Sequence, residues 1–193
     1  MRYRPELGRI HRRRLLSGIA GAGVAAIAGC LGDETDVPEA RAIEQGQSCD
    51  NCDMTITAQP GPAGQAYYLD NPPAALPDGR GDGIARFCSS WCTYTYVLEH
   101  DSEPAGVYTT DYSAVEYDIR DDGGTPVLSA HLDAADFAKA DSLTYVVGSD
   151  VQGAMGGSLV GFSEESDAET FTDTYGGSLT THSDITLETV RTL

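Results

Sequence analysis

The sequence predicts an α+β protein made of two related halves, each with the order β-β-α-β, at residues 48–120 and 121–193. Short apolar segments bounded by Gly, Pro, Asn and Asp predict the strands, and helix signals follow one strand in each half. The segments IARFCSS and LVGFSEE both run from a strand through phenylalanine into a helix, so Phe87 and Phe162 are predicted to be equivalent. Hydrophobic residues make up 40% of the 193-residue chain, which is enough for a real core.

The first 29 residues are predicted to be a Tat-type lipoprotein signal peptide. Arg12 and Arg13, followed by leucines, resemble the twin-arginine export signal. The apolar run after them is too short and too rich in Gly and Ala to span a bilayer stably. It ends in Ile-Ala-Gly-Cys, which resembles a lipobox, so cleavage would free Cys30 for lipid attachment. Residues 30–47 are mostly polar and are predicted to be a flexible tether to the extracytoplasmic face of the cell membrane.

The first half has one helix among its predicted strands. A turn-rich loop with three prolines and three glycines divides the first two strands. We expect strands at 65–70, 84–87, 107–112 and 115–119, the loop at 71–83 and the helix at 89–100.

The second half repeats much of this order. Ser166 and Glu169 have the spacing of a capping box, and Gly176-Gly177 is a fitting helix stop. We expect a turn at 121–124, helices at 131–140 and 166–175, and strands at 143–147, 158–162 and 178–182.

Charge restricts the partners that this protein can have. The formal net charge is -18, and the leader holds six of the twelve basic residues, so the remainder is more acidic still. A field of this sign argues against nucleic acid and against an anionic membrane face as partners. The acidic surface resembles that of proteins from extreme halophiles, where ~1 M salt reduces the screening length to about 3 Å.

Four cysteines remain after Cys30, and they form two close pairs. Cys49 and Cys52 make a C-x2-C pair, and Cys88 and Cys92 make a C-x3-C pair. Disulfides are one interpretation, since thiols outside the cell tend to oxidise. Thioredoxin-like redox chemistry is a second, although the acidic neighbours of the first pair disfavour a free thiolate. A metal site is the third, because a bound cation stabilises thiolates and tolerates nearby carboxylates.

The spacing of the second pair and two methionines bear on which metal would bind. Cys88 and Cys92 are four apart, so one helical face could present both sulfurs, and four thiolates could bind zinc tetrahedrally. Met54 follows the first pair and Met155 lies among small residues in GAMGG. Thioether and thiolate together select Cu(I) over zinc. The three histidines that could each add a ligand are His100, His131 and His182.

The chain resembles the NosL family, the lipoprotein accessory factors of nitrous oxide reductase. CDNCDM, at residues 49–54, resembles the family's CxxCGM motif, with Asp53 where the family usually has glycine. GPAGQAYYLD, at residues 61–70, and the segment at 145–185 resemble the rest of the family pattern. FCSSWC, at residues 87–92, instead resembles the C-x3-C end of TRASH and YHS metal-binding modules.

The resemblance implies a fold, a ligand set and a function. The family's fold resembles part of an organomercurial lyase. Its members bind Cu(I) outside the cytoplasm and are thought to supply it to the copper centre of nitrous oxide reductase. By position, this implies Cys49, Cys52, Met54 and Met155 as ligands, with Cys88 and Cys92 as a second site, a zinc site shared with the first pair, or a disulfide. The protein would be a carrier and not an enzyme.

Two other functions stay open on the sequence. One is an extracytoplasmic thiol-disulfide oxidoreductase. The other is a zinc-stabilised binding module that transfers no metal.

Overall fold

A computed structural model describes residues 37–77 and 80–193. The predicted signal peptide, Cys30 and the first part of the predicted tether lie outside these residues. Among the described helices, none combines the length and hydrophobicity that a bilayer crossing requires.

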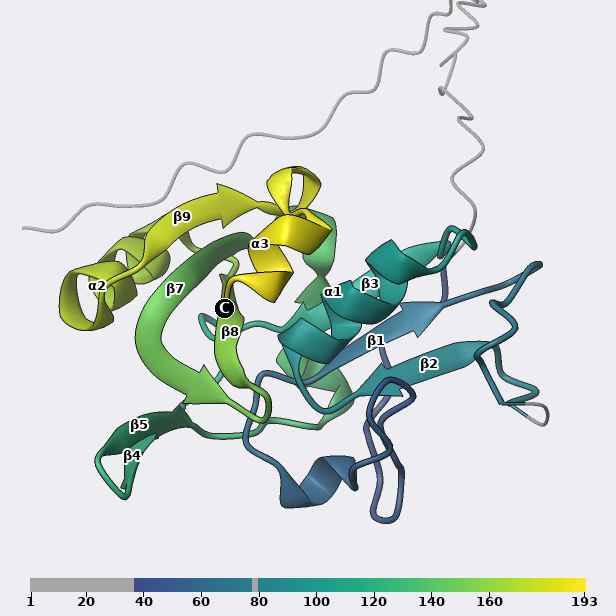
Figure 1. Cartoon of the computed structure of the whole chain (residues 1–193), viewed down its shortest axis with the longest axis horizontal. Helices are drawn as coiled ribbons and strands as arrows, with labels where there is room; N and C mark the ends of the chain where they lie inside the picture. Colours follow the sequence, from purple (N-terminus) through teal and green to yellow (C-terminus); the bar gives the residue numbers. More distant parts are fainter. Residues whose placement is uncertain (1–36, 78–79) are drawn as a thin grey trace, which may run out of the picture. The chain divides into compact units, whose positions relative to one another are not determined.

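The first sheet contains four antiparallel strands in the order β2-β1-β3-β6, and Figure 1 labels the first three of them. The strand β1 is buried along its whole length, and it pairs with β2 on one edge and with β3 on the other. The helix α1 (Ser90–Glu99) follows β2 directly, as expected. The strands are β1 (Gly64–Tyr67), β2 (Ile84–Phe87), β3 (Gly106–Thr110) and β6 (Phe137–Lys139).

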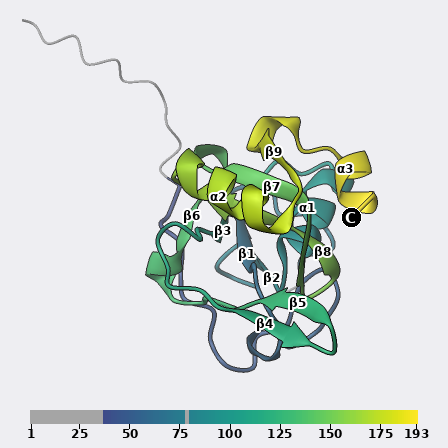
Figure 2. The ribbon, with the colours of Figure 1, turned by 90° about the vertical axis from the view of Figure 1, so that its left-hand side faces the viewer.

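The second sheet is built around the long strand β7, which pairs with β8, β9 and, over one residue pair, β5. Figure 2 shows α2 (Glu165–Tyr175) lying against this sheet. Its apolar side packs there through Ala168 and Phe171. The strands are β4 (Ile119–Asp122), β5 (Thr125–Leu128), β7 (Thr144–Gly153), β8 (Gly156–Phe162) and β9 (Ser178–Thr181).

The two predicted β-β-α-β units are present with the same topology. In each unit the first strand is central, giving the orders β2-β1-β3 and β8-β7-β9. Phe87 pairs with the first residue of β1, and Phe162 pairs with the first residue of β7. The predicted α+β class is therefore confirmed. The boundary at residue 120 stays a prediction, since β6 from the second half extends the first sheet.

Two expected elements are wrong. The predicted helix at 131–140 is instead a 3-10 turn, η2 (Ala134–Asp136), followed by β6, because Phe137 gains burial and β3 offers a free edge. The predicted strand at 115–119 is irregular up to Ile119, where β4 begins. The Asp111 carboxylate accepts the backbone N–H groups of Ser113 and Ser163, and these local bonds end the extended run after β3.

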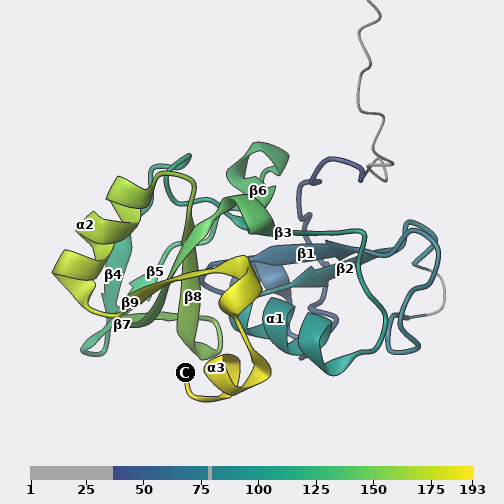
Figure 3. The same ribbon diagram turned by 90° about the horizontal axis from the view of Figure 1, so that it is seen from above.

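Other local predictions need smaller corrections. The predicted capping box of Ser166 does not form, since α2 begins at Glu165 and its N-cap Glu164 makes no side-chain cap. Gly176 ends the helix at a φ of 74°, as expected of a C-terminal glycine. The sequence reasoning missed β5 and the last helix, α3 (Leu187–Arg191), which lies beside α1 (Figure 3). The remaining 3-10 turns are η1 (Ile56–Ala58), η3 (Ala140–Ser142) and η4 (His182–Asp184).

The predicted tether at 30–47 is wrong over the part that the structure describes. The buried Gln65 amide pairs with the backbone of Arg41, accepting its N–H at 3.2 Å and donating to its carbonyl at 2.6 Å. Ile43 is buried and donates its backbone N–H to the carbonyl of Leu132 at 2.8 Å. These contacts hold the segment against the first sheet, because its apolar and backbone groups find partners there. The residues 30–36 lie outside the described part.

Candidate metal centre

The first cysteine pair lies on a tight turn before η1. The N–H of Asp53 donates to the Cys49 carbonyl at 2.8 Å, and the N–H of Cys49 donates to the Met54 carbonyl at 2.9 Å. Asp53 has a φ of 63°, in the left-handed region that favours glycine. Aspartate tolerates this region better than most residues do. The turn therefore forms although Asp53 stands where the resembling motif has glycine.

A buried carboxylate fastens this turn to β2. Asp50 and Arg86 exchange two hydrogen bonds, from the Asp50 N–H to the Arg86 carbonyl at 2.8 Å and from the Arg86 N–H to Asp50 Oδ2 at 2.7 Å. Arg80 adds two contacts to the same carboxylate, at 2.8 and 2.9 Å. Burial raises the pKa of Asp50, and the backbone and Arg80 contacts oppose that shift. The acid beside the first thiol is thus an anchor for the loop.

The second pair flanks the start of α1. β2 ends at Phe87, Cys88 follows it, and Ser89 is the N-cap, whose hydroxyl accepts the N–H of Cys92 at 3.0 Å. Cys88 is therefore outside the helix. The predicted single helical face is wrong, and the turn that enters the helix brings the two sulfurs together. Helix N-termini favour negative charge, which suits thiolates.

The structure brings all four cysteines into one cluster. The Sγ atoms of Cys52 and Cys88 are 3.5 Å apart, and those of Cys88 and Cys92 are 3.8 Å apart. All four ligand atoms lie within 4.8 Å of one another, and all four are free thiols. Sulfurs that surround one ion with tetrahedral bonds of about 2.3 Å are separated by ~3.8 Å. The cluster is thus the right size for a single soft metal ion.

Contacts among the thiols divide their acidity unevenly. Contacts with the Cys88 and Cys92 side chains lower the pKa of Cys49 well below its usual value, although burial opposes that shift. The same contacts with Cys49 raise the pKa of Cys88 and that of Cys92. One thiol of the cluster therefore ionises readily, and the others ionise less readily unless a bound cation compensates their charge.

The two methionines are placed less closely than the cysteines. Met54 is half-buried and packs against the same core cluster as the four cysteines. Met155 lies in the two-residue turn between β7 and β8, and its side chain is 38% exposed. Its neighbour Ala154 packs against that core cluster.

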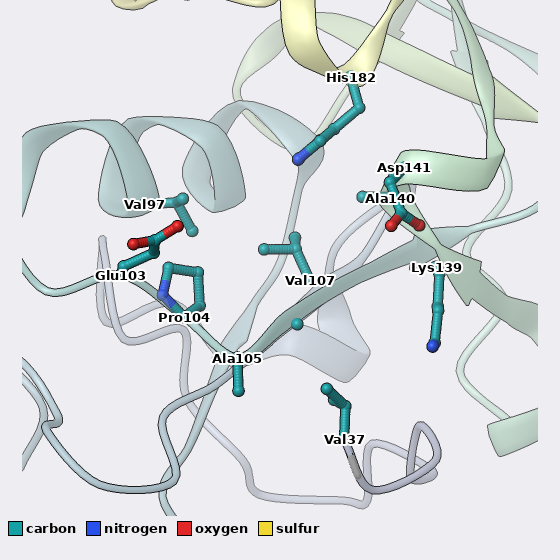
Figure 4. Close-up of a pocket in the computed structure, with 11 residues that line it drawn as sticks. Val37, Val97, Glu103, Pro104, Ala105, Val107, Lys139, Ala140, Asp141 and His182 are labelled. Carbon is teal, nitrogen blue, oxygen red and sulfur yellow. The ribbon is translucent and has the colours of Figure 1, made fainter. Parts of the chain in front are cut away.

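The histidines lie elsewhere. The Nδ1 atom of His182 is 2.8 Å from the Tyr94 hydroxyl, and the ring borders a pocket of about 370 Å³ that Lys139 and Asp141 also line (Figure 4). His131 is hydrogen-bonded to Ser129, and His100 stacks edge-on against Tyr96. Within the described residues, the Cys, His, Asp and Glu groups that could hold a metal ion are the four cysteines alone.

Sequence reasoning missed two residues that position the site. Ser89 stands three residues before Cys92, which is the spacing of an N-cap and its N3 partner, so this signal was readable. Arg80 lies 30 residues from Asp50 in a loop, and no local pattern connects them.

Two β-β-α-β units that carry a cluster of four free thiols, sized for one metal ion, define a small α+β protein with a candidate thiol metal site. The chain belongs to the NosL family, whose family model matches residues 40–190. The predicted resemblance is therefore confirmed.

Two relatives support this membership. The chain is 31% identical over 176 residues to the copper-binding lipoprotein NosL of Stutzerimonas stutzeri, covering 89% of this chain and 78% of that protein. It is also similar to the crystal structure of the copper chaperone NosL from Shewanella denitrificans, with a TM-score of 0.62 and 30% identity over 78% of this chain and 97% of that one. Both relatives are named for binding copper and neither as an enzyme, which confirms the prediction of a non-enzymatic protein.

Proposed function

We propose that this protein is a Cu(I) carrier that delivers copper to an extracytoplasmic acceptor. The observation that carries the proposal is the cluster of four free thiols, which two distant segments of the chain bring within 4.8 Å of one another. Soft thiolate and thioether ligands select Cu(I). Met54 follows the first pair and packs against the core cluster that contains the cysteines, and in this proposal the exposed Met155 closes over the ion from the β7–β8 turn.

Release to the acceptor is ligand exchange at this site. Cu(I) needs only two or three soft ligands, so an acceptor's donors can bind before all of the carrier's donors leave. The ligands must be deprotonated, so affinity for copper falls as the pH falls. By family resemblance, the proposed acceptor is nitrous oxide reductase during assembly of its copper centre.

The place of delivery is also part of the proposal. The leader, with Arg12 and Arg13, would direct export by the twin-arginine route, and Cys30 would carry the lipid that anchors the protein at the extracytoplasmic membrane face. The relative from Stutzerimonas stutzeri is named a lipoprotein, which supports this reading. The acidic composition suits a salt-rich exterior.

Anaerobic titration of the reduced protein with Cu(I), in competition with a chromophoric chelator, tests the proposal. We expect tight binding that the double variant Met54→Ala/Met155→Ala weakens by about tenfold or more, equal to about 1.4 kcal/mol. The matched control is Leu98→Ala/Leu179→Ala, which removes two exposed apolar side chains and should leave affinity unchanged. Equal affinity in the protein and its methionine-free variant would contradict the proposed ligand set.

A zinc-stabilised module is the second candidate, because the 3.5 and 3.8 Å sulfur separations also suit tetrahedral zinc. It predicts that the protein as isolated contains zinc, that chelation unfolds it, and that the methionine substitutions change nothing. Metal analysis together with chelation followed by circular dichroism separates the two candidates.

A further inference from the structure

The thiol cluster is accessible from one side. Cys49, Cys88 and Cys92 are 2%, 1% and 0% exposed, whereas Cys52 is half-buried. A pocket of about 420 Å³ opens beside the first pair, and both Cys49 and Cys52 line it, together with Asn51, Pro77 and Arg80. Because Cys49 is almost fully buried and Cys52 is not, an incoming ligand would meet Cys52 first among the four sulfurs.

The other sides of the cluster are closed by the fold. Ser89 and Ser90 at the start of α1 are fully buried, and the Ser90 hydroxyl accepts the N–H of Leu159 from β8 at 3.0 Å. The packed residues of β2 and α1 surround Cys88 and Cys92 in the larger core cluster. Approach from this direction would require α1 to separate from β8.

The charge at the pocket restricts what can enter it. Asp53 is exposed at the rim, and the carboxylate of Asp50 is already paired with Arg80. The loaded cluster adds thiolate charge behind the rim, and the whole chain carries a formal charge of -18. An anionic donor would be repelled, while a neutral donor on a basic segment would be attracted.

We infer that this pocket is where the copper acceptor docks, and that Cys52 is the first ligand to leave. The inference rests on the proposed function. The acceptor presents a neutral soft donor side chain on a basic segment. Its lone pair forms a bond to Cu(I) before the bond from Cys52 breaks, and the freed Cys52 thiolate then takes up a proton from water. Copper stays monovalent throughout, so no oxidant or reductant is needed.

The first test obstructs the pocket. The Cu(I)-loaded protein is mixed with a methionine-rich peptide flanked by lysines, and copper transfer is followed by stopped flow. We expect Asn51→Trp to slow transfer by about tenfold or more while equilibrium affinity is kept. Gln152→Trp, at an exposed position on the β7–β8 hairpin, adds the same bulk on the Met155 side and should not slow transfer. Transfer from Asn51→Trp at the unsubstituted rate, with copper bound normally, overturns the inference.

The second test uses charge and does not depend on how Asn51→Trp folds. At low salt, the lysine-flanked peptide should receive copper about tenfold faster than a peptide with the same methionines flanked by aspartates, and ~1 M salt should remove the difference. Asp53→Asn should reduce the difference in transfer rate between the two peptides, whereas Asp173→Asn on α2 should leave that difference unchanged. Equal rates for the two peptides at low salt overturn the inference. A failure of every form to bind Cu(I) would instead overturn the proposed function.

Discussion

Asp53 adopts a backbone conformation that ordinary side chains avoid. Among the non-glycine residues at 37–77 and 80–193, Asp53 is the one with a positive φ. Its N–H bond to the Cys49 carbonyl closes the turn that presents Cys49 and Cys52. The conformation is tolerable for aspartate, but it is costly for a side chain that is branched at Cβ. The geometry of the first cysteine pair thus depends on one residue that is not itself a ligand.

Replacing Asp53 should reveal this cost. We expect Asp53→Val to destabilise the reduced, metal-free protein by about 1–2 kcal/mol, because valine is strained in the left-handed region. Asp53→Gly should keep the turn and the copper affinity. Urea denaturation measures the first effect and chelator competition the second. Asp118→Val, at an exposed position without a positive φ, is the control and should cost less. Equal losses at both positions would contradict the proposed strain.

The start of α1 positions the second cysteine pair at the scale of an element. The Ser89 hydroxyl holds the N–H of Cys92, and the Ser89 carbonyl accepts the N–H of Thr93 at 2.9 Å. Trp91, next to Cys92, donates its indole N–H to the Val190 carbonyl in α3 at 3.0 Å. These bonds fix the first turn of the helix, so the Cys92 sulfur is held in place before any metal arrives.

Removing this cap should affect both the fold and the metal site. We expect Ser89→Ala to cost about 1 kcal/mol in the free energy of unfolding, since an orphan N–H loses its acceptor. It should also weaken Cu(I) binding, because the lost bond positions Cys92. Thr186→Ala removes the equivalent cap from α3, where Thr186 accepts the N–H of Thr189. This control should lower stability and leave copper affinity unchanged. If both substitutions weaken copper binding equally, the cap has no special role at the site.

A chain of buried contacts connects the two sheets at the scale of the whole molecule. The Nδ1 atom of His182, just after β9, is hydrogen-bonded to the Tyr94 hydroxyl in α1, and the Tyr94 ring packs edge-on against Tyr145 in β7, with ring centroids 5.6 Å apart. The Tyr145 hydroxyl is 2.8 Å from Thr109 Oγ1 in β3. Burial raises the pKa of Tyr94 and that of Tyr145, so both hydroxyls keep their protons at neutral pH. Paired hydroxyls and edge-on aromatic rings of this kind stabilise a buried structure.

His182 should make the stability of the protein depend on pH. Burial lowers the pKa of His182 below its usual value of 6.5, so the folded state favours the neutral ring. The stability that this neutral ring contributes is complete above the unfolded pKa and is lost as the pH falls through the lower folded pKa. We expect the metal-free protein to lose more stability than His182→Gln does between about pH 6.5 and pH 5.

Urea midpoints across this pH range measure the effect. His131→Gln removes a histidine that bonds only to Ser129 and should keep the pH dependence of the unsubstituted protein. A His182→Gln variant with that same pH dependence would contradict the role given to His182.

The sequence by itself determined the local elements with strong signals and the chemistry of the site. The bounds of β2, the approximate extents of α1 and α2 and the glycine stop of α2 follow from apolar runs and turn residues, all of which act within a few residues. The sulfur side chains proposed as ligands are likewise readable, since thiolates and thioethers bind soft metals wherever they stand in a sequence. For this reason the family was predictable, and so was the set of four cysteines that cluster.

Only the tertiary structure decided what those pieces do together. Phe137 lies in a strand and not in a helix, because pairing with the free edge of β3 and burial in the core stabilise the strand more than local propensity stabilises a helix. Arg41 lies against β1, and not on a free tether, because the buried amide of Gln65 needed its backbone as a partner. The convergence of Cys52 on Cys88 depends on Asp50, in the first cysteine turn, binding both Arg80 and the backbone of Arg86 in β2. Long-range contacts of this kind have no local sequence signal, because each partner gains its stabilisation only after the chain has folded.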